Sequence, residues 1–496
     1  YYNSNTNYNR NIGNCIMSRV EVDTILPQSG TTLTLGSSGD TVTIPSGVSL
    51  APGGGLTLTG NFVVDGGTIK LDGNYPTGTG NVALGDTALD SVASGGTHNT
   101  VIGNQSGTAI STGDHNTAVG SCALITTSTG SNNTAIGDRS LRNNTGGENT
   151  SVGAFSLEAN VGGECNTAVG RTALCGNTTG ASNVAVGFQA LKTNTTAQCN
   201  TAVGTSSLRD NTTGCKNTSI GFNSMLLNTE GCQNTALGVT ALDANTTGDN
   251  NTAIGQSALT TNSTANNNTA VGKSALGTNL TGEENDALGS CALRDNTIGC
   301  RNVAIGKGAM LLNTEGECNV AVGHTALSAQ TTADFNTAIG VKALNTNTTA
   351  SRNTAVGFKS LASNTTGCMN SAIGESSLIC NTEGSRNTAV GRQSLHCNTT
   401  GNFNTALGLD SMYENTTGSN NTSVGRSAML CNTEGVGNTA IGEAALGKNT
   451  TAGNNTAVGF CALRCNTTGT PNVAVGNNAL TANTTAGNNV AVGNQA

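Results

Sequence analysis

Small and aliphatic residues recur along most of this chain at a fixed spacing of 17 residues. The unit that begins at Asn166 reads Asn-Thr-Ala-Val-Gly-Arg-Thr-Ala-Leu-Cys-Gly-Asn-Thr-Thr-Gly-Ala-Ser, and the next unit begins at Asn183. Counting from the first Asn, Gly is position five, the Ala-Leu pair is positions eight and nine, and the second Asn is position twelve. Such strict repetition indicates short units that cannot bury a core alone and therefore stack on one another.

The repeat occupies residues 81–496 and starts 25 times, with the last copy truncated. Gly stands at position five in every copy. Asn stands at position twelve from Asn144 onward, except at Gln330. These two positions therefore carry the structural requirements of the unit.

One copy predicts one coil of a parallel β-solenoid, or β-roll, and hence an all-β fold. Thr-Ala-Val before the Gly has the alternation of a short strand, and the Gly marks a tight bend or a close backbone approach. Asn-Thr-Thr-Gly at positions twelve to fifteen predicts a turn, since Asn tolerates left-handed conformations and Gly supplies the reversal. In three successive copies these structural residues are Gly170, Gly187 and Gly204 and Asn177, Asn194 and Asn211. With coils about 4.8 Å apart, 24 full copies make a rod of about 115 Å.

Two aliphatic rows run along the axis of the predicted rod. Because side chains alternate across a strand, position three (Ala or Ser) faces one side and position four (Val, Ile or Leu) faces the other. Leu or Met at position nine forms the second row. A flat coil has room inside for about one such row, so the other would be a larger exposed stripe than soluble monomers usually show. Burial against identical chains is the economical arrangement, and we expect a homotrimer.

Polar rows are predicted beside the aliphatic ones. Asn side chains at positions one and twelve are expected to form amide ladders that bond the copies above and below. The sequence has 16 Cys, which cluster beside the bends. Cys215 and Cys232 both occupy position sixteen of successive copies, and Cys380 and Cys397 both occupy position eleven. Stacking brings each pair within range of an inter-coil disulfide, and half-buried free thiols are the alternative interpretation.

The first part of the chain has no such period. Residues 1–16 are rich in Asn and Tyr and are expected to form an irregular arm. Residues 17–80 alternate short β-branched runs with Gly, Ser and Pro turns, which predicts a small all-β module for attachment or assembly. Met17 would make a natural initiator, with the preceding residues as a leader or extra segment.

Composition excludes several classes of function. The net charge is −8 and no basic run is present that could follow a phosphate backbone, so we expect no nucleic-acid partner. No apolar run approaches membrane-spanning length, and no secretory signal precedes the repeats, so membrane insertion is not expected. Aromatic residues are 3% of the chain and Trp is absent, so a large conventional core cannot be filled.

Catalytic and metal-binding patterns are not found either. The four His residues are His98, His115, His324 and His396, and they lie on distant copies without metal-ligand or triad spacing. Glu at position fourteen recurs on the predicted turn with no partner carboxylate for glycoside hydrolysis. Four Phe residues at position six suggest edge packing more than sugar stacking, and they are Phe188, Phe222, Phe358 and Phe460. We expect no catalytic residue, no cofactor and no metal site.

Two resemblances to known families follow from the residues. Asn-Thr-Ala-Val-Gly, as in Asn268 to Gly272, resembles the repeat of trimeric autotransporter adhesin heads, which implies a left-handed parallel β-roll assembled as a trimer. The longer unit and the Asn-Thr-Thr-Gly turn depart from that family. The run from Met17 to Gly36, which begins Met-Ser-Arg-Val-Glu-Val-Asp-Thr-Ile-Leu-Pro, resembles the amino-terminal part of bacteriophage tail-fibre proteins.

Together these features favour a non-enzymatic structural fibre of a virion, such as a phage tail fibre, that supports host attachment. Its partners would be two further copies of the chain, a virion baseplate or neighbouring fibre subunits through the N-terminal module, and a host-surface glycan or protein. The alternative is a self-assembling extracellular or cell-surface adhesive filament. An ice-binding solenoid is disfavoured because Val interrupts the Thr row at position two, as at Val184 and Val303.

Overall fold

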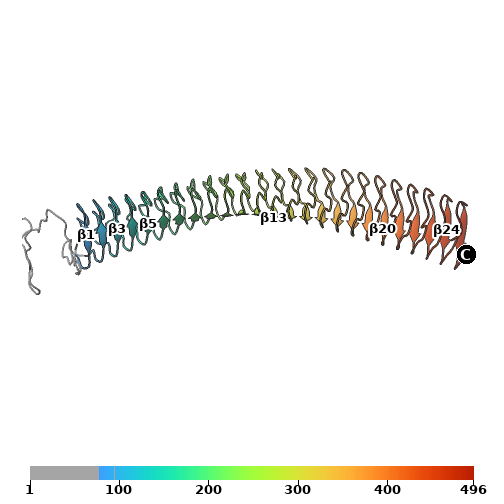
Figure 1. Cartoon of the computed structure of the whole chain (residues 1–496), viewed down its shortest axis with the longest axis horizontal. Coiled ribbons are helices and arrows are strands. Elements are labelled where there is room, and N and C mark those ends of the chain that lie inside the picture. Colours follow the sequence, from blue (N-terminus) through green and yellow to red (C-terminus); the bar gives the residue numbers. More distant parts are fainter. Residues whose placement is uncertain (1–77, 94) are drawn as a thin grey trace, which may run out of the picture. The chain divides into compact units, whose positions relative to one another are not determined.

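The computed structural model describes residues 78–93 and 95–496, all of which belong to one compact unit. These residues form 25 short β-strands in a single parallel sheet, and each strand pairs with the next one along the chain (Figure 1). The strands are β1 (Val82–Leu84), β2 (Thr100–Ile102), β3 (Thr117–Val119), β4 (Thr134–Ile136), β5 (Thr150–Val152), β6 (Thr167–Val169), β7 (Val184–Val186), β8 (Thr201–Val203), β9 (Thr218–Ile220), β10 (Thr235–Leu237), β11 (Thr252–Ile254), β12 (Thr269–Val271), β13 (Asp286–Leu288), β14 (Val303–Ile305), β15 (Val320–Val322), β16 (Thr337–Ile339), β17 (Thr354–Val356), β18 (Ser371–Ile373), β19 (Thr388–Val390), β20 (Thr405–Leu407), β21 (Thr422–Val424), β22 (Thr439–Ile441), β23 (Thr456–Val458), β24 (Asn472–Val475) and β25 (Asn489–Val492). The predicted all-β parallel solenoid of 17-residue coils is confirmed.

The predicted arm 1–16 lies outside the described residues, as does the predicted module 17–80 apart from its last three residues. Within the described ranges no helix is long and apolar enough to cross a membrane.

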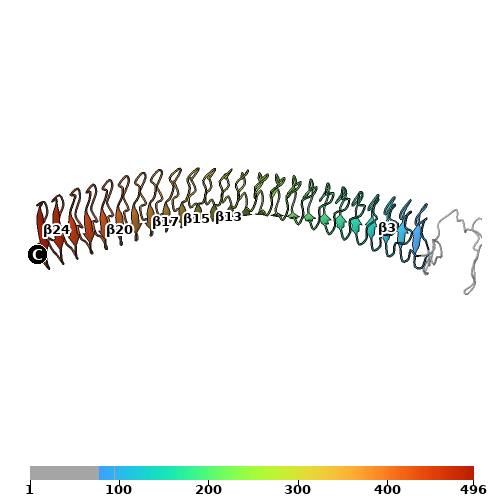
Figure 2. The ribbon, with the colours of Figure 1, turned by 180° about the vertical axis from the view of Figure 1, so that it is seen from behind.

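The coils stack in register, so that each residue lies beside its counterpart in the next copy. In β7, Val184 pairs with Thr167 of β6 on one side and with Thr201 of β8 on the other. Seen from both sides, the strands follow one another in chain order along one side of the stack, and the turns lie along the other (Figures 1 and 2). A parallel ladder of this kind satisfies the backbone polar groups of a coil through its two neighbours.

Each strand ends at the Gly of position five because the backbones of successive coils meet there. Gly187 has a φ of 136°, a conformation that other residues rarely adopt. A Cβ on Gly187 would lie 2.4 Å from the carbonyl oxygen of Gly204 in the next coil. The sequence analysis predicted a bend or a close approach at Gly170, Gly187 and Gly204, and the structure shows both features at each of them.

The bends that follow differ from the predicted turn. In the coil that begins at Asn166, the left-handed residues are Thr172, Leu174 and Ser182, at positions seven, nine and seventeen, with φ of 56°, 52° and 59°. Asn177 does not adopt the left-handed conformation that Asn tolerates, and Gly180, which was expected to supply the reversal, has no positive φ either. Asn177 donates its backbone N–H to the carbonyl of Leu174 at 3.2 Å and points its side chain inward, so the chain turns without a positive φ there.

The core consists of small residues, one aliphatic row and buried amides. Ala at positions three and eight and Leu or Met at position nine are fully buried in nearly every coil, as are Asn at positions one and twelve. The Leu at position nine is left-handed, which costs about 1–2 kcal/mol relative to an ordinary conformation. Burying a Leu side chain stabilises by a similar or larger amount, about 1.5–3 kcal/mol. The strain is therefore sustained because it directs this side chain inward.

The coil that begins at Asn99 shows how the core volume is conserved. Val101 stands at position three in place of Ala, and Gly107 stands at position nine in place of Leu. A Cβ on Gly107 would lie 3.0 Å from Ile110 and 3.1 Å from Val101. A larger side chain from the strand therefore fills the space that the missing Leu would occupy, as close packing demands.

We predict that Gly187→Ala destabilises its coil and both neighbours by about 2–4 kcal/mol, because it adds a strained φ and a backbone clash. Hydrogen–deuterium exchange of residues 166–220 would measure the loss as faster exchange. Gly162→Ala is the matched control, since a Cβ at Gly162 meets nothing within 4 Å. Equal exchange in the two variants would contradict the role assigned to position five.

Candidate functional site

The features that bear on function are rows of identical positions along the stack, and the amide row at position twelve is the most regular. Asn194 Nδ2 donates to Oδ1 of Asn177 at 2.8 Å, and Asn211 Nδ2 donates to Oδ1 of Asn194 at 2.9 Å. Each amide also donates to the position-fifteen carbonyl of its own coil, as Asn177 does to Gly180 at 2.9 Å. The predicted ladder at Asn177, Asn194 and Asn211 is therefore present, and it braces the turn as well as the stack.

The amides at position one form a second ladder with a different pattern. The backbone N–H of Asn183 donates to Oδ1 of Asn166 at 3.0 Å. The side-chain amide of Asn166 crosses the coil and donates to the carbonyl of Gly180 at 2.9 Å. The Gly180 carbonyl thus accepts hydrogen bonds from both amides of its coil, at positions one and twelve. Buried amides are tolerated here because their hydrogen-bonding groups find partners.

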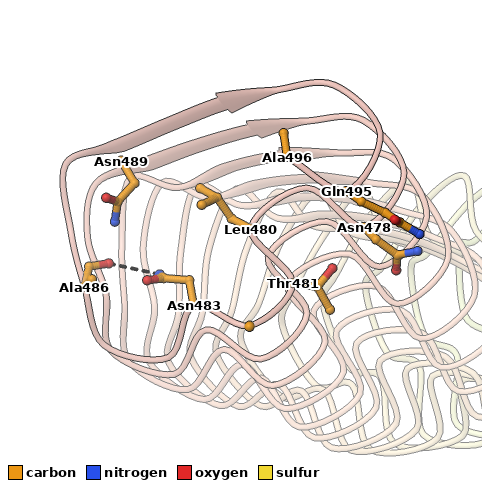
Figure 3. A pocket seen from close by; sticks show the side chains of 9 residues that line it. Asn478, Leu480, Thr481, Asn483, Ala486, Asn489, Gln495 and Ala496 are labelled. Carbon is orange, nitrogen blue, oxygen red and sulfur yellow. Dashed lines mark hydrogen bonds between the residues drawn. The ribbon is translucent and has the colours of Figure 1, made fainter.

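Figure 3 views this arrangement from the last coil. Leu480 lies inside the outline of the coil, and Asn483 donates to the carbonyl of Ala486 at 3.0 Å. The open space among these side chains is lined by Asn489 as well and has a volume of about 580 Å³. It is the interior surface that the next coil covers elsewhere in the stack.

Gln330 is a natural break in the position-twelve ladder. Its Nε2 still donates to Oδ1 of Asn313 at 3.2 Å and to the carbonyl of Ala333 at 2.9 Å. The longer side chain places Oε1 2.9 Å from Nδ2 of Asn336, which donates to it. The Gln330 oxygen, which would otherwise accept a hydrogen bond from Asn347, is therefore directed to Asn336 at position one instead. One additional methylene redirects a hydrogen bond without leaving the acceptor unpaired.

Two further polar rows were not predicted from the sequence. At position thirteen, the Thr178 hydroxyl donates to the carbonyl of Thr195 at 3.0 Å, and its counterparts repeat this bond along the stack. At position sixteen, a short acceptor side chain receives the backbone N–H of the preceding coil, as Asp334 receives that of Glu317 at 2.8 Å. Ser, Asp, Asn and Cys share this acceptor role in different coils. The recurrence of short acceptors at position sixteen was the signal that could have revealed it.

Of the two predicted aliphatic rows, the one at position four is the exposed row. Leu or Met at position nine is inside, whereas position four is half-buried or exposed in all 25 strands. Residues at position four that are at least one-third exposed include Leu84, Ile102, Ile136, Val169, Ile220, Leu237, Leu288, Ile305, Ile339, Ile373, Leu407, Ile441, Val475 and Val492. The row runs the full length of the sheet.

The cysteines of the two predicted pairs differ in their surroundings. The sulfur atoms of Cys215 and Cys232 lie 3.0 Å apart as thiols. The sulfur of Cys397 instead lies 3.5 Å from Nδ1 of His396, and Cys380 is also a free thiol. Burial raises the pKa of Cys380 and of Cys397, which keeps both protonated at neutral pH.

Three of the four His residues stack on another ring, and the prediction that all four lie on distant copies was wrong for His98 and His115, which lie on successive coils. The rings of His98 and His115 stack with centroids 4.9 Å apart, and those of His396 and Tyr413 stack at 4.6 Å. Burial lowers the pKa of His396, against a smaller opposing effect of Asp410. In the described part of the chain no group of three or more His, Cys, Asp or Glu residues could hold a metal ion. The Glu residues at position fourteen are exposed on the turn, as predicted, and they are Glu230, Glu315, Glu383 and Glu434.

The Phe residues at position six are more exposed than edge packing predicts. About half of each side chain is accessible at Phe222 and Phe460, and slightly less at Phe188 and Phe358. The Lys359 ammonium lies 5.2 Å from the ring centre of Phe358, within cation–π range. These rings are therefore available on the surface of the stack.

We predict that Gln330→Asn stabilises the stack by about 1 kcal/mol, because an Asn oxygen at this position returns to Asn347 and restores one buried amide–amide bond. The measurement is hydrogen–deuterium exchange of residues 313–364, which should slow. Asn211→Gln provides the opposite change in an intact part of the ladder and should accelerate exchange there. If both variants shift exchange in the same direction, the ladder does not control local stability.

No known protein family matches this chain, and neither a curated protein nor a solved structure shows significant similarity to it.

Proposed function

We propose that this chain is the shaft of a homotrimeric structural fibre, carried on a virion, that holds host-attachment material away from the particle. The observation that carries the proposal is the exposed aliphatic row at position four. The 25 copies within the chain act as an internal comparison of what each position accepts. Position four is Val, Ile or Leu in every copy, although it faces outward.

Other outward positions accept charged residues. Position six is Asp138, Arg171, Phe188 or Lys273 in different copies, and position two includes Asp286 among its Thr and Val residues. Strand propensity alone does not account for position four, because Leu is accepted there in four copies, whereas Thr, which is common at position two, never occurs. A constraint to remain apolar on an exposed face is typical of a surface that is covered by a partner.

The size of the row suits a stable interface. A strip about 115 Å long and about 7 Å wide, the distance between positions two and four, has an area of roughly 800 Å². This is about what one partner contributes to a standard protein–protein interface. Its full-length extent favours a partner with the same repeat, and a second and third copy of the chain provide one in a closed cyclic arrangement.

A stack of repeated coils is also suited to act as a spacer, which supports the assignment of this chain as a shaft. Each added coil lengthens the rod by about 4.8 Å and leaves the remaining coils unchanged. The resemblance of residues 17–36 to phage tail-fibre proteins suggests the N-terminal segment as the end that joins a baseplate or a neighbouring fibre subunit. A host glycan or protein would then contact the shaft or material beyond it, with the exposed Phe residues at position six as one available surface.

We predict that electron microscopy of the purified chain shows discrete rods, whose repeat portion is about 115 Å long. Discrete rods of defined length are expected of a fibre that is mounted on a particle. Indefinite filaments grown end to end would instead favour an extracellular or cell-surface adhesive filament, and would overturn the virion assignment.

We further predict that Ile220→Glu with Leu237→Glu converts the trimer to monomers, because charges on the position-four row cannot be buried without a partner charge. Mass measured by light scattering after size-exclusion chromatography should fall threefold. Leu227→Glu with Leu312→Glu is the matched control, since these position-eleven side chains are each 41% exposed, against 38% and 45% for Ile220 and Leu237. A wild-type monomer, or dissociation by the control pair, would contradict this interface.

A further inference from the structure

Cys215 and Cys232 form a thiol pair whose geometry goes beyond packing. Both belong to the position-sixteen row and lie in successive coils, and both are partly accessible. Their sulfur atoms are 3.0 Å apart. Stacked Cα atoms are about 4.8 Å apart, which falls within the range that disulfides span.

From these contacts we propose that Cys215 and Cys232 are a disulfide site, which links two successive coils of one chain under oxidising conditions. A disulfide requires the sulfurs to approach to about 2.05 Å, so the atoms must move by about 1 Å. Rotation of the two side chains provides that movement while the coil backbones stay in register. The proposal is independent of the proposed function, because the bond lies within one chain.

The alternative is that sulfur serves at position sixteen only as a backbone acceptor. The N–H of Cys215 donates to the sulfur of Cys232 at 3.0 Å, just as the N–H of Cys368 donates to the hydroxyl of Ser385 at 3.0 Å. The N–H of Cys232 donates to the carboxylate of Asp249 at 2.6 Å. The acceptor role explains a short polar side chain in each coil, but it does not require Cys in two successive coils.

The other Cys residues of this row provide the contrast. Cys368 donates its thiol hydrogen to the carbonyl of Thr366 at 3.4 Å, as Cys232 does to that of Glu230, and Cys300 accepts from the N–H of Glu283 at 3.3 Å. Neither Cys300 nor Cys368 has a Cys at position sixteen of an adjacent coil. Cys397, in the second predicted pair, has its sulfur 3.5 Å from the ring of His396. The described contacts therefore single out Cys215 and Cys232.

The oxidant is a small-molecule disulfide such as oxidised glutathione. One thiolate of the pair attacks it, forms a mixed disulfide and releases one small thiol. The neighbouring thiolate then attacks the protein sulfur of that mixed disulfide, which forms the Cys215–Cys232 bond and releases the second small thiol. Two protein thiols are oxidised and one small disulfide is reduced to two thiols. Burial raises the pKa of Cys232, so formation should be faster at pH 8.5 than at pH 7.

The experiment treats the full chain with oxidised glutathione, blocks remaining thiols by alkylation and maps tryptic peptides without reduction. Cleavage after Lys216 separates the two Cys residues, because Cys215 lies in peptide 210–216 and Cys232 in peptide 217–273. We expect these two peptides to be recovered joined and to separate on reduction, with the chain still running at the mass of one subunit. Both cysteines recovered as alkylated thiols or as glutathione adducts, or joined to other cysteines, would overturn the proposal.

Two variants separate the disulfide from the acceptor role. In the wild type, oxidation should slow hydrogen exchange of residues 200–250, because the disulfide links the two coils. Cys232→Ser keeps a short acceptor for the N–H of Cys215, so it should fold as wild type when reduced. It should, however, lose the slowing of exchange on oxidation. Cys368→Ser changes a single Cys at the same position and should retain that slowing in full. If oxidised wild type and oxidised Cys232→Ser exchange at the same rate, the pair does not link the coils.

Discussion

The constraint on which the structure depends is that each coil makes most of its hydrogen bonds with the two neighbouring coils. The N–H of Val184 donates forward to Asn200 at 2.8 Å, and the N–H of Gly187 donates back to Val169 at 2.8 Å. A coil without neighbours would leave these buried groups unpaired, and its short sequence cannot compensate with a core of its own. Stability is therefore a property of contacts between coils, and any residue that prevents close stacking affects three coils together.

Buried amides make that stacking specific. An aliphatic core would accept a shifted register at modest cost, whereas an amide at position twelve bonds correctly only beside another amide at the same height. Buried Ser residues follow the same logic. Ser151, Ser219 and Ser423 are the Ser residues at position three, and each hydroxyl lies 2.7 or 2.8 Å from a Ser at position eight of the preceding coil. Each of these three hydroxyls enters the core together with its partner, because an unpaired one would cost about 1–3 kcal/mol.

The period of the sequence was sufficient to predict the fold, the close approach at Gly187, the ladder through Asn194 and the presence of one buried and one exposed aliphatic row, but not which of positions four and nine is buried. It did not predict the turn geometry at Leu174. A left-handed Leu contradicts the preference of isolated residues, and only the stacked neighbours compensate the strain. The acceptor row that includes Cys232 was also missed. Its hydrogen bonds join residues one coil apart, whereas the sequence analysis treated turn residues by their local chemistry. The oligomer and its partners depend on contacts between chains, and they stay proposals.

The repeat separates residues that build the stack from residues that face outward, and this separation explains how one unit supports both length and contact. Positions one, three, five, nine and twelve are committed to neighbouring coils and scarcely vary, whereas position six accepts Asp138, Phe188 or Lys273 without altering the core. Position four belongs to neither group, since it faces outward and yet is always Val, Ile or Leu. Within a single coil nothing would oppose a polar residue there, because Thr fits the same strand at position two. We therefore propose that the constraint comes from outside the coil, because a row that is apolar at every level is matched most simply by the same row on another copy.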